Sequence, residues 1–297
     1  MSDSKEENKE KMKRANQSDE YKVESTTEEF DNKDDIEQII VSDSDSPRQI
    51  DSTTKEEEPE DYVIPKKVLP CHNVPERIII VYDRAEDEVS TKFELGAQSF
   101  TPADMIKRSL EFFLHNKSSI DNRHQFALVV LNENSVVWVK DFTHDVKSII
   151  TTLQDTPNCH TEDVLVLDKL FDLVNSKSEL RKLDTGNLDV PPKYVVRILF
   201  VYGRSFTMPQ IKNQDLRKGI VENPFFTFDV IMTHEKPNTD NNAERISKFL
   251  QNVDTKGFAY FFPVARNAKD LHIAMAKLLG HPLQRPCQKA ANYFINT

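Results

Sequence analysis

The chain has 297 residues, and its 39 Lys and Arg side chains against 49 Asp and Glu give a formal net charge of −10. The first sixty residues hold 20 of the acidic and 9 of the basic side chains, so they carry −11 and the remaining residues carry +1. A nearly neutral remainder offers no basic surface for nucleic acid. There is also no run of about 18 apolar residues, which argues against a transmembrane helix. We therefore expect neither nucleic acid nor a membrane as a partner.

Three cysteines, Cys71, Cys159 and Cys287, lie far apart along the chain and are odd in number. They fit a reducing compartment better than a disulfide framework. The N-terminus lacks the apolar segment of a signal peptide. Together these features predict a protein of a reducing compartment.

Residues 1–60 contain no Gly, Cys or Trp and only two aromatic side chains. Such a segment cannot bury enough apolar surface to offset the roughly 1–2 kcal/mol per residue that backbone ordering costs. We therefore predict a disordered acidic tail. Its one apolar cluster, residues 36–41, precedes an acidic serine-rich run at 42–46, as in SUMO-interaction or phosphorylation motifs, where a short strand adds to a partner's sheet. The alternative is a chance apolar cluster.

A proline-containing linker at residues 61–75 leads to a folded domain that we place at 76–280. Apolar runs rich in β-branched residues predict six strands, at 77–83, 126–131, 136–139, 195–202, 225–231 and 257–264. Helical spacing of apolar residues predicts helices between most of them, one starting at 102 and the others at 145–154, 163–174, 215–219, 243–252 and 268–279. Thr101 and Asn267 are the expected N-caps of the first and last helices, and Gly280 is the expected C′ residue of the last.

Strands that alternate with helices are typical of a doubly wound α/β sheet. The second and third strands are joined by a short turn that contains Asn132 and Asn134, which predicts a hairpin. One strand of an otherwise parallel sheet is then antiparallel. Because von Willebrand A-type domains have one short antiparallel edge strand at this place, we predict a von Willebrand A-like domain with a mostly parallel sheet.

The first strand ends in Asp83, where an open α/β sheet binds its ligands. A phosphate-binding loop would need glycines there, and none is present. Metal-binding von Willebrand A domains carry Asp-x-Ser-x-Ser at this point, and here Asp83 matches the Asp whereas Ala85 and Asp87 replace the serines. Thr161 is the candidate for the threonine ligand of a later loop. We predict a degenerate site (Asp83, Asp87, Thr161) that holds no metal or other cofactor.

No catalytic set is evident in the sequence. It has no Gly-x-Ser-x-Gly turn, no His-Glu-x-x-His helix and no His-x-His followed by Asp, which is the zinc deubiquitinase pattern. The pairs Cys71–His72 and Cys159–His160 do not have the spacing of zinc ligands. We therefore expect no enzyme activity. A hydrolase on the same scaffold is one alternative. Another is a stand-alone, metal-dependent adhesion-type domain that binds an acidic ligand through Asp83 and Thr161.

The last predicted helix is followed by a segment with prolines at 282 and 286. Prolines at this spacing predict an extended segment that loses little entropy on binding. Arg285 can pair bidentately with a carboxylate, and Leu283 can fill a small pocket. The segment at 281–297 is thus a candidate for binding a partner, and the alternative is an ordinary linker that ends the helix.

The block Met-Ala-Lys-Leu-Leu-Gly-His-Pro-Leu-Gln-Arg-Pro-Cys-Gln at 275–288 resembles the MERIT-forty family, as do residues 126–130, 194–197 and 254–257. The resemblance covers residue 73 to the end. It implies a non-catalytic von Willebrand A-like adaptor in BRISC- and ARISC-type complexes, which cleave ubiquitin chains linked through lysine sixty-three. Roles in complex integrity, DNA-damage repair, chromatin regulation and mitosis are implied with it, as is a cytoplasmic and nuclear localisation.

The implied partners are the BRE subunit, which has ubiquitin-conjugating-like folds, an Abraxas-type scaffold and a zinc deubiquitinase subunit. In the family, a Pro-x-x-Arg segment docks on BRE. It corresponds here to Pro282 and Arg285, with Leu283, Gln284 and Pro286 between and beside them. A glycine-ended tankyrase-binding motif of the family's tail has no match, since residues 1–60 contain no Gly.

Overall fold

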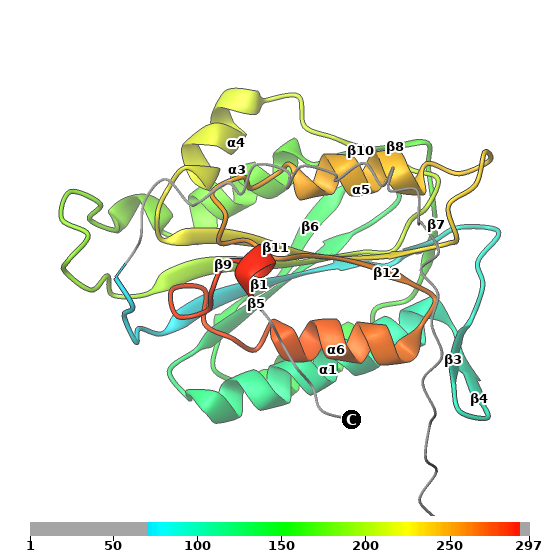
Figure 1. The fold of residues 1–297 in the computed structure, drawn as a ribbon, viewed down its shortest axis with the longest axis horizontal. Coiled ribbons are helices and arrows are strands. Elements are labelled where there is room, and N and C mark those ends of the chain that lie inside the picture. Colours follow the sequence, from blue (N-terminus) through cyan, green and yellow to red (C-terminus); the bar gives the residue numbers. More distant parts are fainter. Residues whose placement is uncertain (1–69, 292–297) are drawn as a thin grey trace, which may run out of the picture. The chain divides into compact units, whose positions relative to one another are not determined.

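The computed structural model describes residues 70–291, so the acidic tail, its apolar cluster and most of the linker lie outside the described residues. Within that range, six strands form one sheet, with helices on both of its faces (Figure 1). From one edge to the other, the strands are β12 (Phe261–Ala265), β11 (Phe226–His234), β9 (Val195–Tyr202), β1 (Glu76–Asp83), β5 (Gln125–Leu131) and β6 (Val136–Thr143).

Neighbouring strands of this sheet run parallel, except that β6 pairs antiparallel with β5 at the edge. Strand β1 lies in the middle, where Ile79 is opposite both Ala127 of β5 and Ile198 of β9. The strand order reverses at β1, so the carboxyl ends of β1 and β9 are the switch point of the sheet. The predicted doubly wound, von Willebrand A-like sheet with one antiparallel edge strand is confirmed.

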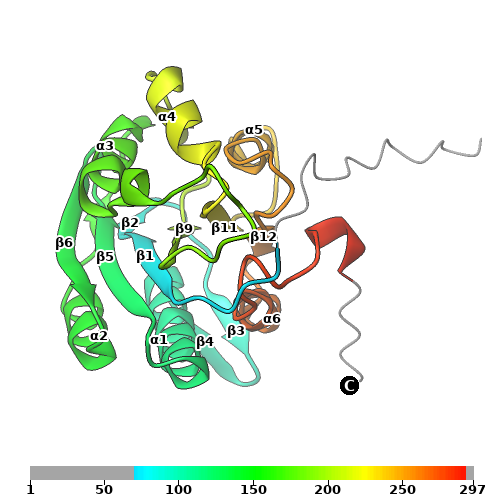
Figure 2. The ribbon, with the colours of Figure 1, turned by 90° about the vertical axis from the view of Figure 1, so that its left-hand side faces the viewer.

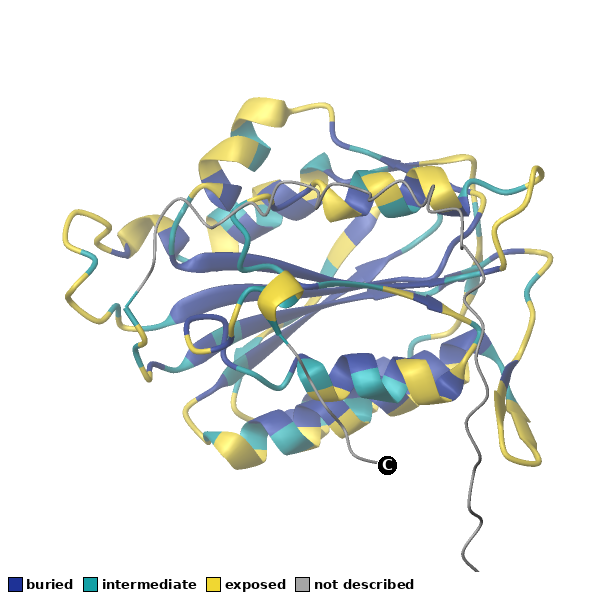
Figure 3. Ribbon diagram, in the orientation of Figure 1, coloured by how far each residue is buried: buried dark blue, intermediate teal, exposed yellow. Residues whose placement is uncertain are grey.

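The helices form two layers, one on each face of the sheet (Figure 2). One layer contains α1 (Pro102–Ile120), α2 (Val146–Gln154) and α6 (Ala268–Lys277), and the other contains α3 (Asp168–Lys177), α4 (Gln214–Val221) and α5 (Ala243–Gln251). Ile78 and Ile80 pack under the first layer, whereas Ile79 and Val81 pack under the second. The continuous apolar run of β1 is thereby explained, because both of its faces are covered (Figure 3).

The expected helix caps are present where α1 and α6 begin. The Oγ1 atom of Thr101 accepts a hydrogen bond from the backbone N–H of Asp104 at 3.1 Å. Asn267 accepts one from Asp270 at 3.2 Å. The end of α6 differs from expectation, because its C-cap is Leu278 and Gly280 lies beyond the C′ position.

Two predicted elements begin later in the structure than the sequence indicates. Residues 163–167 were expected in a helix, but Val164–Val166 form the short strand β8, which pairs with β10 (Met208–Gln210), and α3 begins at Asp168. Valines at alternate positions favour this strand. The strand expected at 257–264 begins only at Phe261, after a loop in which Gly257 has a φ of 92°.

Short local pairs escaped the sequence analysis because two or three residues carry no periodic signal. Strands β2 (Ala85–Glu86) and β7 (Cys159–His160) pair beside the loop that follows β1. Strands β3 (Phe93–Leu95) and β4 (Gln98–Phe100) form a hairpin whose turn contains Gly96 at a φ of 61°. The remaining elements are the 3₁₀ turns η1 (Leu180–Lys182) and η2 (Gln288–Ala290). Among residues 70–291, no helix combines the length and the apolar character that crossing a membrane requires.

Candidate functional site

Asp83 ends β1 at the switch point of the sheet, and its carboxylate is bound by Arg204 from the loop after β9. The Arg204 Nε atom lies 3.1 Å from each Asp83 carboxylate oxygen, and Nη2 lies 3.0 Å from Oδ1. The same guanidinium donates to the backbone carbonyls of Asn132 and Glu133 in the β5–β6 turn. Only 3% of Asp83 and none of Arg204 is exposed. A protein cation therefore neutralises the carboxylate on which a metal site would depend.

Asp87 lies beside this pair, and its Oδ2 atom accepts a hydrogen bond from the Ser205 backbone N–H at 2.6 Å. Burial, aided by the negative charge of Asp83, raises the pKa of Asp87 to about 6. Its Oδ1 atom and the Ser90 hydroxyl are both buried without a hydrogen-bond partner among the described residues. Both residues line a cavity of about 10 Å³, which is close to the space that a single water needs.

The third residue of the predicted degenerate site, Thr161, is half-buried in the loop between β7 and β8. No hydrogen bond joins its hydroxyl to Asp83 or Asp87 in the described structure. Within residues 70–291, no three His, Cys, Asp or Glu side chains are grouped so that they could hold a metal ion. The residues present do not fit a divalent cation, because Arg204 already occupies Asp83. The metal-dependent alternative therefore lacks its ligand set.

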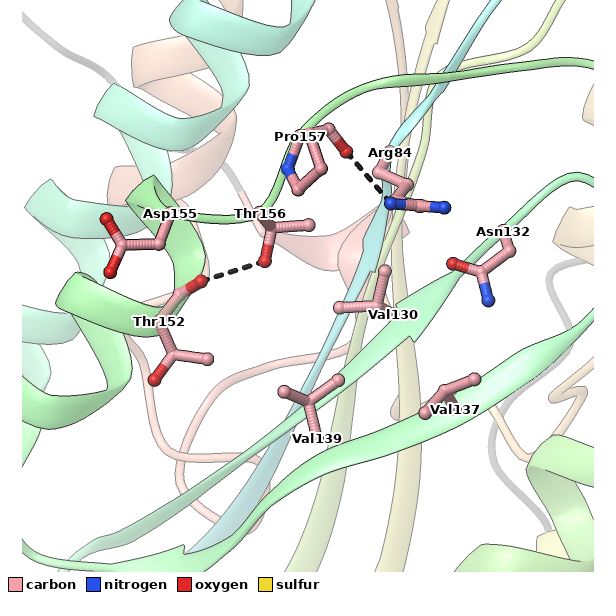
Figure 4. A pocket seen from close by; sticks show the side chains of 9 residues that line it. All are labelled: Arg84, Val130, Asn132, Val137, Val139, Thr152, Asp155, Thr156 and Pro157. Atoms are coloured by element: carbon pink, nitrogen blue, oxygen red, sulfur yellow. Dashed lines mark hydrogen bonds between the residues drawn. The ribbon is translucent and has the colours of Figure 1, made fainter.

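A second hollow lies at the β6 edge of the sheet, between that strand and the end of α2 (Figure 4). It measures about 410 Å³, and its floor contains Val130, Val137 and Val139. Arg84 lies at one wall, where it donates to the Pro157 carbonyl at 3.2 Å. The only other charged side chain that lines the hollow is Asp155. The residues that line this hollow do not place a nucleophile beside a base, so they form no catalytic arrangement.

Residues 281–285 are folded into a turn, so the extended conformation predicted for them is wrong. The backbone N–H groups of Gln284 and Arg285 donate to the His281 carbonyl at 2.9 and 3.0 Å. The His281 ring also accepts from the Leu283 N–H at 3.1 Å, much as a helix N-cap does. Pro282 suits this geometry because its fixed φ fits the first position of a helical turn. The two prolines are therefore compatible with a turn as well as with an extended chain.

Arg285 is directed into the domain and not toward a partner. Its Nη2 atom donates to Asp229 Oδ1 and, at 2.8 Å, to the Phe258 carbonyl, and its guanidinium lies 3.9 Å from the ring centroid of Tyr260. Leu283 joins the hydrophobic core. Pro282 is buried as well, whereas Gln284 and Pro286 are exposed. The carboxylate and the pocket that the sequence led us to expect on a partner thus belong to this chain.

The Arg285–Asp229 pair continues into a buried ionic network that links three strands, α1 and the turn. Arg197 of β9 binds Asp229 at 2.7 Å and Glu76 at 3.1 Å. Glu76 in turn lies 2.5 Å from Lys117, whose ammonium also donates to the Leu279 carbonyl at 2.9 Å. Burial alone would raise the pKa of Glu76, but Arg197 and Lys117 outweigh it and lower this pKa to about 2. The network therefore anchors the C-terminal turn to the sheet through Arg285 and Asp229.

Sequence reasoning missed this network, although one signal was present. Arg197 is the one Lys, Arg, Asp or Glu side chain of β9 and Asp229 is the one of β11, and the fold buries both completely. Charged side chains at such positions are paired in folded proteins. That rule indicates buried ion pairs but does not say which residues form them.

The strand order and the antiparallel edge strand define a von Willebrand A-like domain. The von Willebrand A domain of SpRpn10 is a similar solved structure, with 13% identity, coverage of 72% of this chain and 99% of that chain, and a TM-score of 0.44. The protein named BRISC and BRCA1-A complex member 1 from Mus musculus is 37% identical, over 75% of this chain and 68% of its own length. The Homo sapiens protein of that name is also 37% identical, over 75% and 69%. These identities show that the chain belongs to the BRISC and BRCA1-A complex member 1 family, as its C-terminal block predicted. A separate comparison with family models found no match.

Proposed function

We propose that this chain is a non-catalytic adaptor of a BRISC- or BRCA1-A-type deubiquitinase complex, and that its C-terminal turn docks on the BRE subunit. Family membership supports the first part, because the names of the relatives state that they are members of these complexes. An Abraxas-type scaffold and a zinc subunit that cleaves ubiquitin chains linked through lysine sixty-three are the other proposed partners. Cytoplasmic and nuclear localisation and roles in DNA repair and mitosis belong to this proposal.

The observation that carries the docking proposal is a turn that is buried on one side and exposed on the other. Arg285 and Leu283 fix its inner side, and Gln284 and Pro286 form its outer side. A surface held in one geometry loses little entropy when a partner binds. Arg285 then acts as a positioning residue that sets the turn, whereas Gln284 and Pro286 contact the partner.

The absence of catalysis is supported by the state of the reactive side chains. Burial raises the pKa of the Cys159 thiol, which disfavours the thiolate that a cysteine nucleophile needs. Asp83 is neutralised by Arg204 and is closed off from solvent. Neither residue has the paired base and open position that a catalytic site requires.

Co-expression tests the proposal. The intact chain should co-purify with the BRE subunit of the same species. Alone, it should leave ubiquitin chains linked through lysine sixty-three intact, and cleavage should begin only when the zinc subunit and its scaffold are added. Cleavage by the isolated chain would contradict the adaptor assignment, and failure to co-purify with BRE would contradict the docking assignment.

A further inference from the structure

We propose that Arg204 is a built-in cation, which takes over the charge-neutralising and loop-linking role of the divalent ion in metal-binding von Willebrand A domains. The carboxyl-end loops of this chain are then closed without metal. Arg204 lies at the edge of the sheet beside Asp83, and its role does not depend on the partner of the C-terminal turn.

The groups around Arg204 are those that a hard cation would use. Both carboxylate oxygens of Asp83 and the backbone carbonyls of Asn132 and Glu133 surround the guanidinium. Carboxylate and carbonyl oxygens are the usual ligands of Ca²⁺, and carboxylates also bind Mg²⁺. Here the same oxygens accept N–H bonds from a group that is always charged and has a planar fork of donors. Oxygens that could bind a hard cation are therefore bound to a side-chain cation of the same chain.

The contacts of Arg204 join three loops of the carboxyl edge. Asp83 ends β1, Asn132 and Glu133 form the turn between β5 and β6, and Arg204 itself follows β9. The Gly203 N–H adds a further bond to Asp83 Oδ2 at 3.2 Å. Because a guanidinium cannot dissociate from its own chain, these loops stay linked at any metal concentration.

Asp87 is the second acidic side chain at this edge of the sheet. The charges of Asp83, Arg266 and Arg204 all act on the Asp87 carboxyl, which has one oxygen unpartnered among the described residues. Truncation of Arg204 would free the Asp83 carboxylate and the Asn132 and Glu133 carbonyls that its guanidinium now binds. Such a set should accept a divalent cation, which the intact site excludes.

The test compares the full chain with its Arg204→Ala variant in the presence and absence of millimolar Ca²⁺, Mg²⁺ or Mn²⁺. The thermal midpoint of the variant should fall by several degrees, and at least one of these ions should restore part of the loss. The wild-type midpoint should not respond to the ions. The matched control is Arg204→Ala with Asp83→Asn, which should lose stability without any recovery.

Two outcomes would overturn the proposal: a variant whose stability no ion restores, or a wild-type chain that binds Mn²⁺ in calorimetry and loses this binding in Asp83→Asn. If Arg204→Ala does not fold during expression, refolding of the denatured variant provides the same comparison. Its yield should rise when Ca²⁺ or Mg²⁺ is added, and an unchanged yield counts against the built-in cation.

Discussion

Arg285 and Asp229 form an ion pair that is almost completely buried, although one residue lies in a C-terminal turn and the other in the middle of β11. The same carboxylate binds Arg197, so Asp229 joins the turn to the centre of the sheet. Burial alone would raise the pKa of Asp229, but the charges of Arg285 and Arg197 lower it. The segment that we propose to bind a partner is therefore also a part of the domain core.

Replacement of Arg285 by Ala should destabilise the full chain strongly. Removal of a buried charge costs about 3–5 kcal/mol when its partner is left uncompensated, and the loss here should lie at the lower end of that range because Arg197 still binds Asp229. Urea denaturation measures the loss. The adjacent exposed residue is the control, since Gln284→Ala should change the free energy of unfolding by less than about 0.5 kcal/mol. Equal stability of the two variants would show that Arg285 is not anchored in the core.

Glu76 and Lys117 should be energetically coupled. Glu76→Gln and Lys117→Met each disrupt a pair whose members are at most 1% exposed. The double variant should be less destabilised than the sum of the single variants, with a coupling energy of about 1–3 kcal/mol from denaturation midpoints. Simple additivity would mean that the short Glu76–Lys117 contact does not contribute to stability.

The raised pKa of Asp87 should make the stability of the fold depend on pH. Its pKa rises from 3.8 to about 6 on folding, so the folded state keeps a proton that the unfolded state releases between these values. Stability is therefore lost as the pH rises through this window and is not regained above it. Asp87→Asn removes the loss, so the variant should gain up to about 1–3 kcal/mol over wild type near pH 8 and almost nothing below about pH 4.

A matched substitution checks this sign. Asp189→Asn, which changes an exposed carboxylate in the loop after η1, is the matched control for the loss of one acidic side chain. If Asp87→Asn instead loses stability relative to wild type at neutral pH, the carboxylate is stabilised in the fold and not penalised by burial.

The sequence predicted most of the fold because the necessary signals were local. The apolar run of β1 and the spacing in α1 each lie within one element, and they indicated strand and helix correctly. The partners of charged side chains are not local, since Arg204 and Asp83 are 121 positions apart and Arg285 and Asp229 are 56 apart. No pattern in a single sequence specifies such pairs.

The conformation of the C-terminal turn also could not be predicted from its prolines alone. Pro282 restricts its own φ, and that value occurs in extended chains and in the first turn of a helix alike. The His281 ring, which accepts the Leu283 N–H, decides between them here. The sequence therefore indicated a candidate segment but did not predict the direction of its side chains.

The most direct test of the adaptor account is the dissociation constant between the full chain and the BRE subunit. The decisive variant is Gln284→Ala with Pro286→Ala, which alters only the exposed side of the turn. Its control is Gln98→Ala with Pro191→Ala, an exposed pair of the same residue types outside the turn. At unchanged thermal midpoints, we predict that the first variant binds at least about tenfold more weakly, equivalent to about 1.4 kcal/mol, while the control binds like wild type. Equal affinity of the two variants would contradict docking through the C-terminal turn.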